Sequence, residues 1–232
     1  MLKFLCFLLS AVSTDAAYSD SGLRDRKLVY VAGSLFNSWE QLAQEGIADL
    51  LEDAGFRTFL PQRDGLEMVK IEEVLEKQFH TPKKKAGELM SEVIYSLDVY
   101  QVAERCGAYV GNFNGVVMDD GTIAELTYAA MVGNPVIYFR DDYRSHFNGS
   151  MNPLVTVAAD AIVTDKKMIV PALKSCLKKN RIFEPALPPI IAERVKKGKA
   201  LWQELEKLNT ERTERRRTAI ARAILRIFSP QA

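Results

Sequence analysis

Five short apolar segments alternate with amphipathic stretches along residues 27–165, and this alternation restricts the possible folds more than any other feature. The segment KLVYVAG at 27–33 is rich in β-branched and apolar residues and ends in a glycine, as a buried strand does. The stretch SWEQLAQEGIADLLEDAG at 38–55 has apolar residues at helical spacing, with Ser38 as a candidate N-cap and Gly55 as a stop. Strands that alternate with helices predict a parallel sheet with right-handed crossovers.

The same pattern continues along the chain. Four further strands are expected at 57–61, 108–113, 135–141 and 161–165, and two further helices at 91–107 and 122–133. We therefore predict a three-layer α/β sandwich around a five-stranded parallel sheet, flavodoxin-like or Rossmann-like, followed by a C-terminal helical extension. In such sheets ligands bind at the carboxyl ends of the strands.

Charge divides the chain into an acidic body and a basic appendage. Residues 1–165 carry 14 Lys and Arg against 24 Asp and Glu, whereas residues 166–232 carry 17 against 6, although the net charge is only +1. We expect a lead at 1–26, an α/β domain at 27–165 and a basic helical extension at 166–232. The extension has apolar residues at helical spacing, so one or two helices are expected to pack on the body or on a neighbouring subunit, in preference to nucleic acid or a membrane.

The first 17 residues resemble a short secretory signal, with one lysine and about ten apolar residues before a group of small ones. A non-native upstream start or a disordered lead explains them equally well. We expect a cytoplasmic protein, with export as the alternative, in which case the glycosylation acceptor Asn148-Gly149-Ser150 would matter. No apolar run reaches 18 residues, so no membrane span is expected.

Two other features do not indicate a specific function. The three cysteines, Cys6, Cys106 and Cys176, have no metal-ligand spacing, so reduced thiols and no metal site are expected. Residues 64–90 are polar and charged, and we interpret them as an insertion or lid with a short helix and an exposed lysine-rich loop at 81–87.

The segment MDDGTIAELTYAAMVG at 118–133 places three carboxylates at the start of an expected helix. Thr122 and Glu125 have the spacing of a capping box, and Asp120 with Gly121 has the composition of a plain turn, so local structure alone could explain this segment. However, topology also directs Tyr30 and Asp98 toward the same crevice as the acids at 119 and 125. Paired carboxylates at one sugar carbon are the arrangement that breaks a glycosidic bond, and the helix dipole would keep a glutamate near its N-terminus ionised.

Two of these segments together resemble a known family, the nucleoside 2-deoxyribosyltransferases. The first is VYVAGSLFN, a strand with a tyrosine followed by a glycine turn, and the second is DGTIAELTYAAMVGNPVIYF. The resemblance covers roughly residues 27–165. It implies that Glu125 is the nucleophile, that Tyr30 holds its carboxylate, that Asp119 helps to protonate the departing base, and that Asp98 binds the base or sugar edge.

The resemblance also implies a set of substrate-binding residues, which are Gly33, Ser34, Phe36, Gln62, Asp120, Gly121 and Asn152. In this set Phe36 stacks on the base and Gln62 bonds to it, while Asp120 could replace Asp119 as the acid. Asn152 would reach the 5′-hydroxyl from a neighbouring subunit, so a homo-oligomer with shared active sites is implied. The implied substrates are deoxynucleosides and free nucleobases, with no metal or organic cofactor and no nucleic acid.

The function implied is nucleotide salvage by transfer of the 2-deoxyribosyl group between nucleobases, through a covalent glutamyl-deoxyribosyl intermediate. One alternative is an N-glycosidase for nucleosides or 5′-monophosphates that uses water as acceptor, for which only Ser34 argues. Another is a non-catalytic nucleotide-binding module whose basic helices recruit a partner. No Walker or dinucleotide-binding glycine loop supports that third option.

Overall fold

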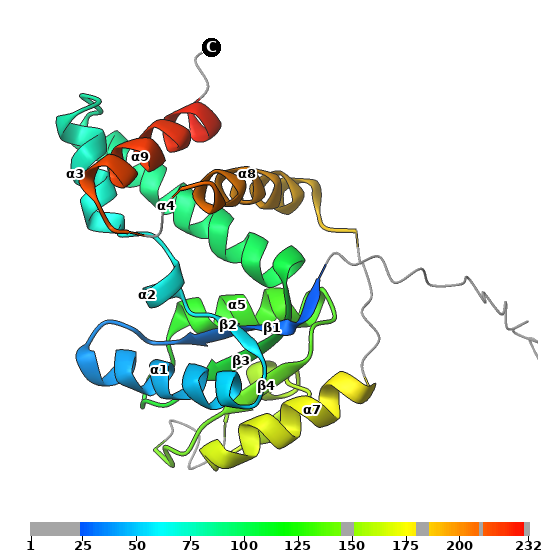
Figure 1. Ribbon diagram of the computed structural model, residues 1–232. Coiled ribbons are helices and arrows are strands. Elements are labelled where there is room, and N and C mark those ends of the chain that lie inside the picture. The colour runs from blue at the N-terminus through cyan, green and yellow to red at the C-terminus, as the bar shows by residue number, and fades with distance from the viewer. Residues whose placement is uncertain (1–23, 145–150, 180–185, 209–210, 230–232) are drawn as a thin grey trace, which may run out of the picture.

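The computed structural model describes residues 24–144, 151–179, 186–208 and 211–229 (Figure 1). They form two parts that lie one above the other in this view: an α/β part built on a sheet, and a helical part. The helical part consists of α3 (Met68–Lys77), α4 (Lys83–Tyr100), α8 (Pro189–Glu206) and α9 (Glu214–Phe228).

The sheet has five parallel strands in the order β2-β1-β3-β4-β5. The strands are β1 (Asp25–Gly33), β2 (Arg57–Phe59), β3 (Cys106–Asn112), β4 (Val136–Phe139) and β5 (Ala161–Val163). This order is that of the flavodoxin-like doubly wound sheet, in which the direction of winding reverses between the first and third strands. The predicted fold class is confirmed.

Helices cover both faces of the sheet and make the three layers. One face packs on α1 (Ser38–Asp53) and α7 (Ile169–Lys179). The other face packs on α5 (Asp120–Met131) and on a π-helical turn, η1 (Gln101–Arg105), which continues from α4. Because α7 belongs to this core, we propose that the α/β domain extends past residue 165 to the end of α7.

The alternation of side chains along β1 decides which residues face the site. Val29 and Val31 point to the cluster under α1, whereas Leu28, Tyr30 and Ala32 point to the cluster under α5. Successive side chains of a strand point to opposite faces, so a tyrosine at position 30 must project toward α5. This placement brings its ring under the helix that carries the acidic segment.

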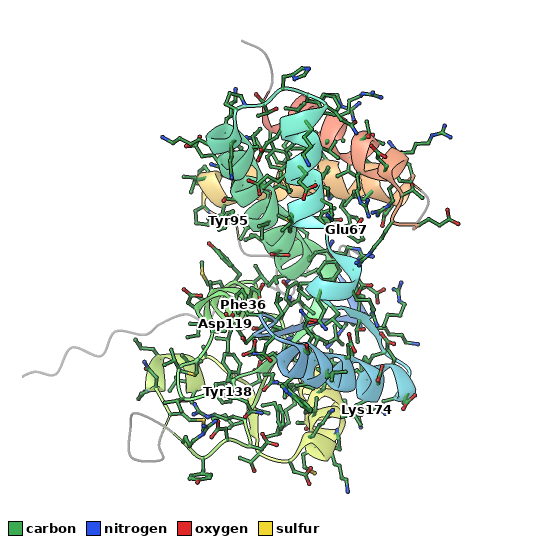
Figure 2. All side chains as sticks on the ribbon, turned by 90° about the vertical axis from the view of Figure 1, so that its left-hand side faces the viewer. Phe36, Glu67, Tyr95, Asp119, Tyr138 and Lys174 are labelled. Carbon is green, nitrogen blue, oxygen red and sulfur yellow. The ribbon has the colours of Figure 1, made fainter. Side chains whose placement is uncertain are left out.

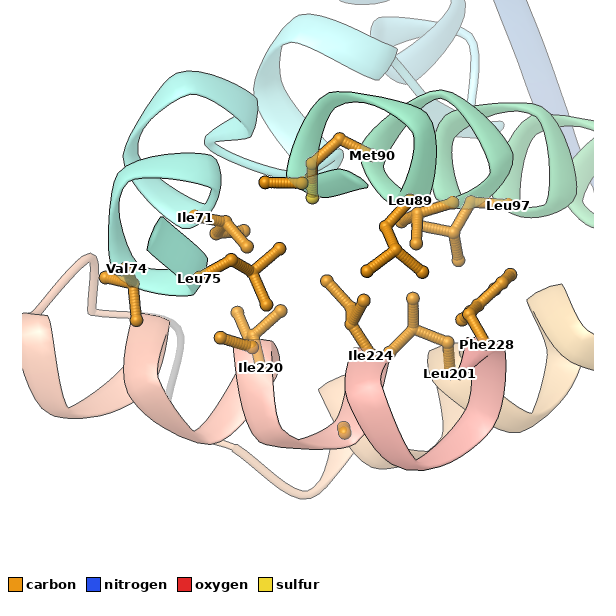
Figure 3. Close-up of a cluster of buried hydrophobic side chains, with 14 of the residues drawn as sticks. Ile71, Val74, Leu75, Leu89, Met90, Leu97, Leu201, Ile220, Ile224 and Phe228 are labelled. Carbon is orange, nitrogen blue, oxygen red and sulfur yellow. The ribbon is translucent and has the colours of Figure 1, made fainter. Parts of the chain in front are cut away.

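The helical part has an apolar core of its own (Figure 3), formed where α3 and α4 pack on α8 and α9. Its buried residues include Leu75, Leu89, Leu201, Ile220 and Ile224. The last part of the basic extension thus forms two helices, α8 and α9, and their apolar residues pack on α3 and α4 of the same chain.

Residues 64–90, which the sequence indicates as an insertion or lid, contribute buried side chains of α3 and α4 to this core, so the expectation of a largely exposed segment is wrong. The lysine-rich stretch expected to be a loop is instead the first turn of α4, which begins at Lys83 after Pro82. The buried residues Ala86, Leu89 and Met90 have the i, i+3, i+4 spacing of a helix, so their burial favours helix over loop here.

Three short elements complete the fold, namely α2 (Pro61–Asp64), α6 (Pro153–Thr156) and η2 (Lys166–Met168). Cys106 and Cys176 are buried free thiols. Residues 1–23, which include most of the lead and Cys6, and the glycosylation acceptor at 148–150 lie outside the described residues. Within the described ranges, every helix is too short or too polar to span a bilayer.

Candidate active site

A buried tyrosine and a buried glutamate form the centre of the site. The Tyr30 hydroxyl on β1 donates a hydrogen bond of 2.7 Å to Oε1 of Glu125, which lies in the second turn of α5. The Tyr30 ring is held between Phe59, with ring centroids 5.4 Å apart, and Tyr109, with centroids 6.0 Å apart. The hydroxyl is therefore fixed in position by packing on both sides of its ring.

Asp119, and not Thr122, is the N-cap of α5. Its Oδ2 accepts hydrogen bonds of 2.7 Å from both the backbone N–H and the hydroxyl of Thr122. The capping-box interpretation is therefore wrong, because an acid three residues before Thr122 already satisfies the orphan N–H groups. Since the helix starts at Asp120, Glu125 lies too far along it to cap and is directed to the site.

Asp98 on α4 and Glu125 are neighbouring, partly buried carboxyl groups, and the charge of Asp98 affects the pKa of Glu125. Burial raises the pKa of Asp98 to about 7. Burial, and next the negative charge of Asp98, raises the pKa of Glu125 well above its usual range, while the hydrogen bond from Tyr30 opposes this rise. Burial therefore opposes ionisation of Glu125, and so acts against the helix dipole that is expected from the sequence to keep this glutamate ionised.

A cavity of about 500 Å³ opens between the two parts of the molecule. One side, which we call the sheet wall, consists of Ala32, Gly33, Phe59, Asp119, Asp120, Gly121, Thr122 and Glu125. The opposite side, which we call the helical wall, consists of Leu66, Met68, Ile94, Leu97, Asp98, Trp202 and Leu205. Leu35, Phe36, Pro61, Gln62 and Gly65 complete the lining. Figure 2 shows Phe36 and Asp119 together at the waist between the two parts.

Most of the residues named from the sequence meet at this cavity. Eight of these predicted residues line the cavity in the described part of the chain: Gly33, Phe36, Gln62, Asp98, Asp119, Asp120, Gly121 and Glu125. Tyr30 lies beneath the cavity and reaches it through its bond to Glu125.

Two candidates lie elsewhere within the described residues. Ser34 is not among the lining residues, and its side chain bonds to Glu40, which lowers the pKa of that carboxyl. Asn152 is likewise absent from the lining and caps α6, where its Oδ1 accepts a hydrogen bond of 3.0 Å from the Leu154 N–H.

Three binding candidates show distinct local chemistry. A Cβ at Gly33 would lie 2.0 Å from Gln44 Nε2, so any other residue at this turn would require the Gln44 side chain to move. Gln62 Nε2 donates to the Gln41 carbonyl at 2.9 Å, whereas its Oε1 is buried without a partner in the described part of the chain. Phe36 is 80% exposed at the mouth of the cavity.

Sequence reasoning missed the apolar lining, which comes mostly from the helical part. Ile94 and Leu97 lie on α4 close to Asp98, and Ile94 is four residues before that acid, on the same helix face. This spacing of four residues indicates that Ile94 lies beside Asp98 and therefore beside the site. Trp202 and Leu205 belong to the apolar stripe of the extension, but no local pattern indicates that this stripe also reaches a ligand cavity.

Among the described residues, no group of three or more His, Cys, Asp or Glu side chains has a geometry that could hold a metal ion. The residues that line the cavity instead provide carboxyl groups, a buried amide oxygen and aromatic rings. These groups can bind and protonate a polar organic ligand.

Fold and site together define a flavodoxin-like α/β protein with an acidic cavity at the carboxyl edge of its sheet. Residues 29–173, more than half of the chain, match the family model described as nucleoside 2-deoxyribosyltransferase. The chain belongs to this family. The match ends within α7, so α8 and α9 lie beyond it.

Two solved structures are similar over most of their own length. One is a 2-deoxyribosyltransferase from the psychrotolerant bacterium Bacillus psychrosaccharolyticus, with 19% identity over 61% of this chain and 89% of that chain, at a TM-score of 0.43. The other is a conserved protein from Enterococcus faecalis V583, with 18% identity over 65% of this chain and 99% of that chain, at a TM-score of 0.44. No curated protein matches the chain.

Proposed function

We propose that this protein transfers the 2-deoxyribosyl group of a deoxynucleoside from one nucleobase to another, in two displacements at C1′. The observation that carries the proposal is the 2.7 Å hydrogen bond from Tyr30 to Glu125 beside a cavity that also holds Asp98 and Asp119. Family membership supports the same chemistry.

In the first displacement a carboxylate oxygen of Glu125 attacks C1′. The bond from C1′ to the base nitrogen breaks, its electron pair goes to the base, and a proton from a neighbouring acid neutralises the departing base. In the second displacement the nitrogen of another base attacks C1′ and gives its proton to the acid that was deprotonated in the first step, the ester bond to Glu125 breaks, and the carboxylate is restored. Two inversions give net retention at C1′.

Each acid has a distinct part in this proposal. Tyr30 donates to the Glu125 carboxylate and so favours its ionised form, which is the form that attacks C1′; the same hydroxyl also opposes the rise in the pKa of Asp98. Asp98, the neighbouring carboxyl group, is a candidate to accept the proton that Glu125 gives up. Asp119 protonates the base, and Asp120, also at the cavity, is the alternative for this step. Gln62, with its unpartnered Oε1, accepts a hydrogen bond from the base.

Hydrolysis is the second candidate, because the mouth of the cavity is open to water. Phe36 at this mouth is 80% exposed, so within a single subunit water can reach the ester as readily as a second base. The 5′-monophosphate version of this alternative gains no support from Ser34, whose side chain is engaged by Glu40 away from the lining.

The test is incubation of a deoxynucleoside with and without a second free base, read by chromatography. A new nucleoside supports transfer, whereas free deoxyribose alone favours hydrolysis, and binding without turnover favours a non-catalytic module. Mass spectrometry of the protein during turnover should detect one added deoxyribosyl group on the peptide that contains Glu125. Loss of this adduct in the Glu125→Ala variant is required, and full activity of that variant would refute the mechanism.

We further propose that the active protein is a homo-oligomer in which Asn152 serves a neighbouring subunit. Large apolar side chains are exposed at the cavity mouth, as Phe36, at the start of α1, as Trp39, and at α6 beside Asn152, as Leu154 and Val157. Such exposure marks association surfaces. Mixing the Glu125→Ala and Asn152→Ala variants should restore activity if sites are shared, and a mixture as inactive as its parts would contradict sharing.

A further inference from the structure

We propose that α8, which lies beyond the family match, selects the nucleobase: Trp202 and Leu205 form the wall against which the base binds, and they favour bases with an apolar or aromatic substituent. This inference rests on the proposed function, since it takes a deoxynucleoside as the ligand. Both residues line the cavity that contains Glu125, although the chain between α5 and α8 is long.

The direction of the reaction places the base at the helical wall. A carboxylate that attacks C1′ approaches from one side of the sugar, and the base departs from the opposite side. Glu125 enters the cavity from the sheet wall, so the base extends toward the helical wall. A series of ring contacts follows the same direction, from Tyr30 to Phe59 at 5.4 Å and from Phe59 to Trp202 at 5.7 Å, edge to face.

The helical wall provides apolar contact and few hydrogen bonds. The indole N–H of Trp202 is already donated to Glu206 at 2.6 Å, and Arg105 lies over the indole ring at 4.4 Å from its centroid. Except for Asp98, the other described residues of this wall are aliphatic side chains or methionine: Leu66, Met68, Ile94, Leu97 and Leu205. A polar base edge would be desolvated here without partners, whereas an apolar substituent would be favoured.

Contacts along α8 hold this wall firmly against α4. A Cβ at Gly198 would lie 2.0 Å from the Ser96 carbonyl oxygen, so the two helices approach at backbone distance. Ion pairs flank this approach, with Lys197 at 3.0 Å from Glu92, which Arg194 also contacts. The base therefore meets a fixed surface, which is what discrimination between substituents requires.

Intrinsic fluorescence can test the proposal without turnover, because the chain has two tryptophans. Trp39 is 83% exposed and is not among the described lining residues, so Trp39→Phe leaves Trp202 as the only reporter. This change is combined with Glu125→Gln to prevent reaction. The double variant is titrated with 2′-deoxyadenosine and its N6-benzyl derivative, and with 2′-deoxyuridine and its 5-benzyl derivative.

We expect the benzylated member of at least one pair to change the Trp202 emission and to bind at least tenfold more tightly than its parent. Equal affinity within both pairs, or no binding by any of the four, would overturn the proposal. Turnover by the wild-type protein is measured separately with the parent nucleosides. Absence of turnover alongside a preserved tenfold preference would refute the proposed function and leave the base-binding wall standing.

Variants on α8 test whether this helix causes the preference for the benzylated nucleoside, with affinity measured by calorimetry in the Glu125→Gln background. Trp202→Ala should reduce the tenfold preference to less than threefold, and Trp202→Phe should keep most of it, because the ring contact is retained. Ile190→Ala, on the same helix at a residue that is 66% exposed, is the matched control and should leave the preference unchanged. Circular dichroism checks that each variant is folded. A folded Trp202→Ala protein, or failing that a Leu205→Ala protein, with undiminished preference would refute the assignment.

Discussion

The two walls of the cavity differ in what they contribute to the protein. The sheet wall presents Glu125 beside Asp119, with Tyr30 beneath it, so ionisable groups are buried there at an energetic cost. The helical wall presents mainly aliphatic and aromatic side chains, and Leu205 belongs at once to the cavity lining and to the core of the helical part. Asp98 is the exception: it lies on α4 in the helical wall, but it is ionisable and its charge raises the pKa of Glu125.

We therefore expect activity and stability to be separable in this molecule. Replacement of Glu125 on the sheet side should reduce activity while leaving stability equal or higher, because it removes a carboxyl group whose ionisation is disfavoured by burial. Changes in the helical core should reduce stability first. The following variants test this division, in order of the size of the expected effect.

Glu125→Gln should give the largest effect, a loss of about 10⁴-fold or more in transfer rate, which corresponds to about 5.5 kcal/mol of activation free energy. The amide keeps the shape of the side chain but cannot form the ester. Steady-state kinetics with two bases measures this loss.

The melting temperature of the same variant should equal or exceed that of the wild type at alkaline pH, since the amide does not have to be ionised in a site where burial disfavours the charged carboxylate. Glu88→Gln, at an exposed position of α4, is the matched control and should alter neither rate nor stability. An inactive Glu125→Gln protein that has also lost stability would contradict the proposed separation of activity from stability.

Leu201→Ala should produce the converse, a loss of about 2–5 kcal/mol in the free energy of unfolding. Leu201 is fully buried in the core that joins α8 to α4 and α9, so truncation leaves a cavity in that core. Urea denaturation measures the loss. The rate per folded molecule should fall much less than in Glu125→Gln, and an equally large fall in rate would show that the two parts are not separable.

The sequence predicts the α/β part well, because each strand and helix there carries its own pattern. The apolar run around Val29 and Val31 is bounded by a glycine, and strands of a parallel sheet that are buried on both faces typically have such continuous apolar sequences. The position of Tyr30 opposite Glu125 follows from this topology together with the family resemblance. What local pattern could not decide was whether Thr122 or Asp119 caps α5, since both residue types are good N-caps.

The helical part was much harder to predict, because its elements are separated along the chain. Residues of α3 such as Ile71 pack on Ile220 and Ile224 of α9, about 150 positions later, and no local signal specifies this pairing. Each segment alone has a polar surface, so the first was interpreted as a lid and the last as a basic appendage. The role of Trp202 in the cavity depends on the same long-range packing.

Tyr30→Phe should reduce the transfer rate by roughly 10- to 150-fold, because a hydrogen bond to a charged group contributes about 1.5–3 kcal/mol. The ring and its contacts with Phe59 and Tyr109 are kept, so stability should change little. The loss should appear in kcat more than in KM, since the hydroxyl donates to the proposed nucleophile Glu125 and Tyr30 is not itself among the described lining residues. A loss confined to KM would assign Tyr30 to substrate binding instead.

Asp98→Asn should make stability less dependent on pH. In the wild type, the Asp98 pKa of about 7 lies above its ordinary value of 3.8, so the folded protein binds a proton more tightly than the unfolded chain. Stability therefore falls as pH rises from about 4 to about 7, and the asparagine removes this fall. We expect a gain of roughly 1–2 kcal/mol at pH 8 over wild type and little gain at pH 4. Thermal melts at both values measure it. An equal gain at both pH values would exclude titration of this group as the cause.

The ion pair between Glu67 and Arg217 should give the smallest effect, although it joins the start of α3 to α9 with two hydrogen bonds of 2.9 Å. Both side chains remain partly solvated, and pairs of this kind contribute about 0.2–1 kcal/mol. Glu67→Gln should therefore lower the free energy of unfolding by no more than about 1 kcal/mol.

The stabilisation by this ion pair should also depend on pH. The Arg217 hydrogen bond lowers the pKa of Glu67, so the stabilisation is present above the ordinary pKa of 4.5 and is lost as pH falls through the lowered value. A larger loss in urea at pH 7, or one that persists unchanged at pH 2, would show that Glu67 stabilises the junction by packing and not by charge.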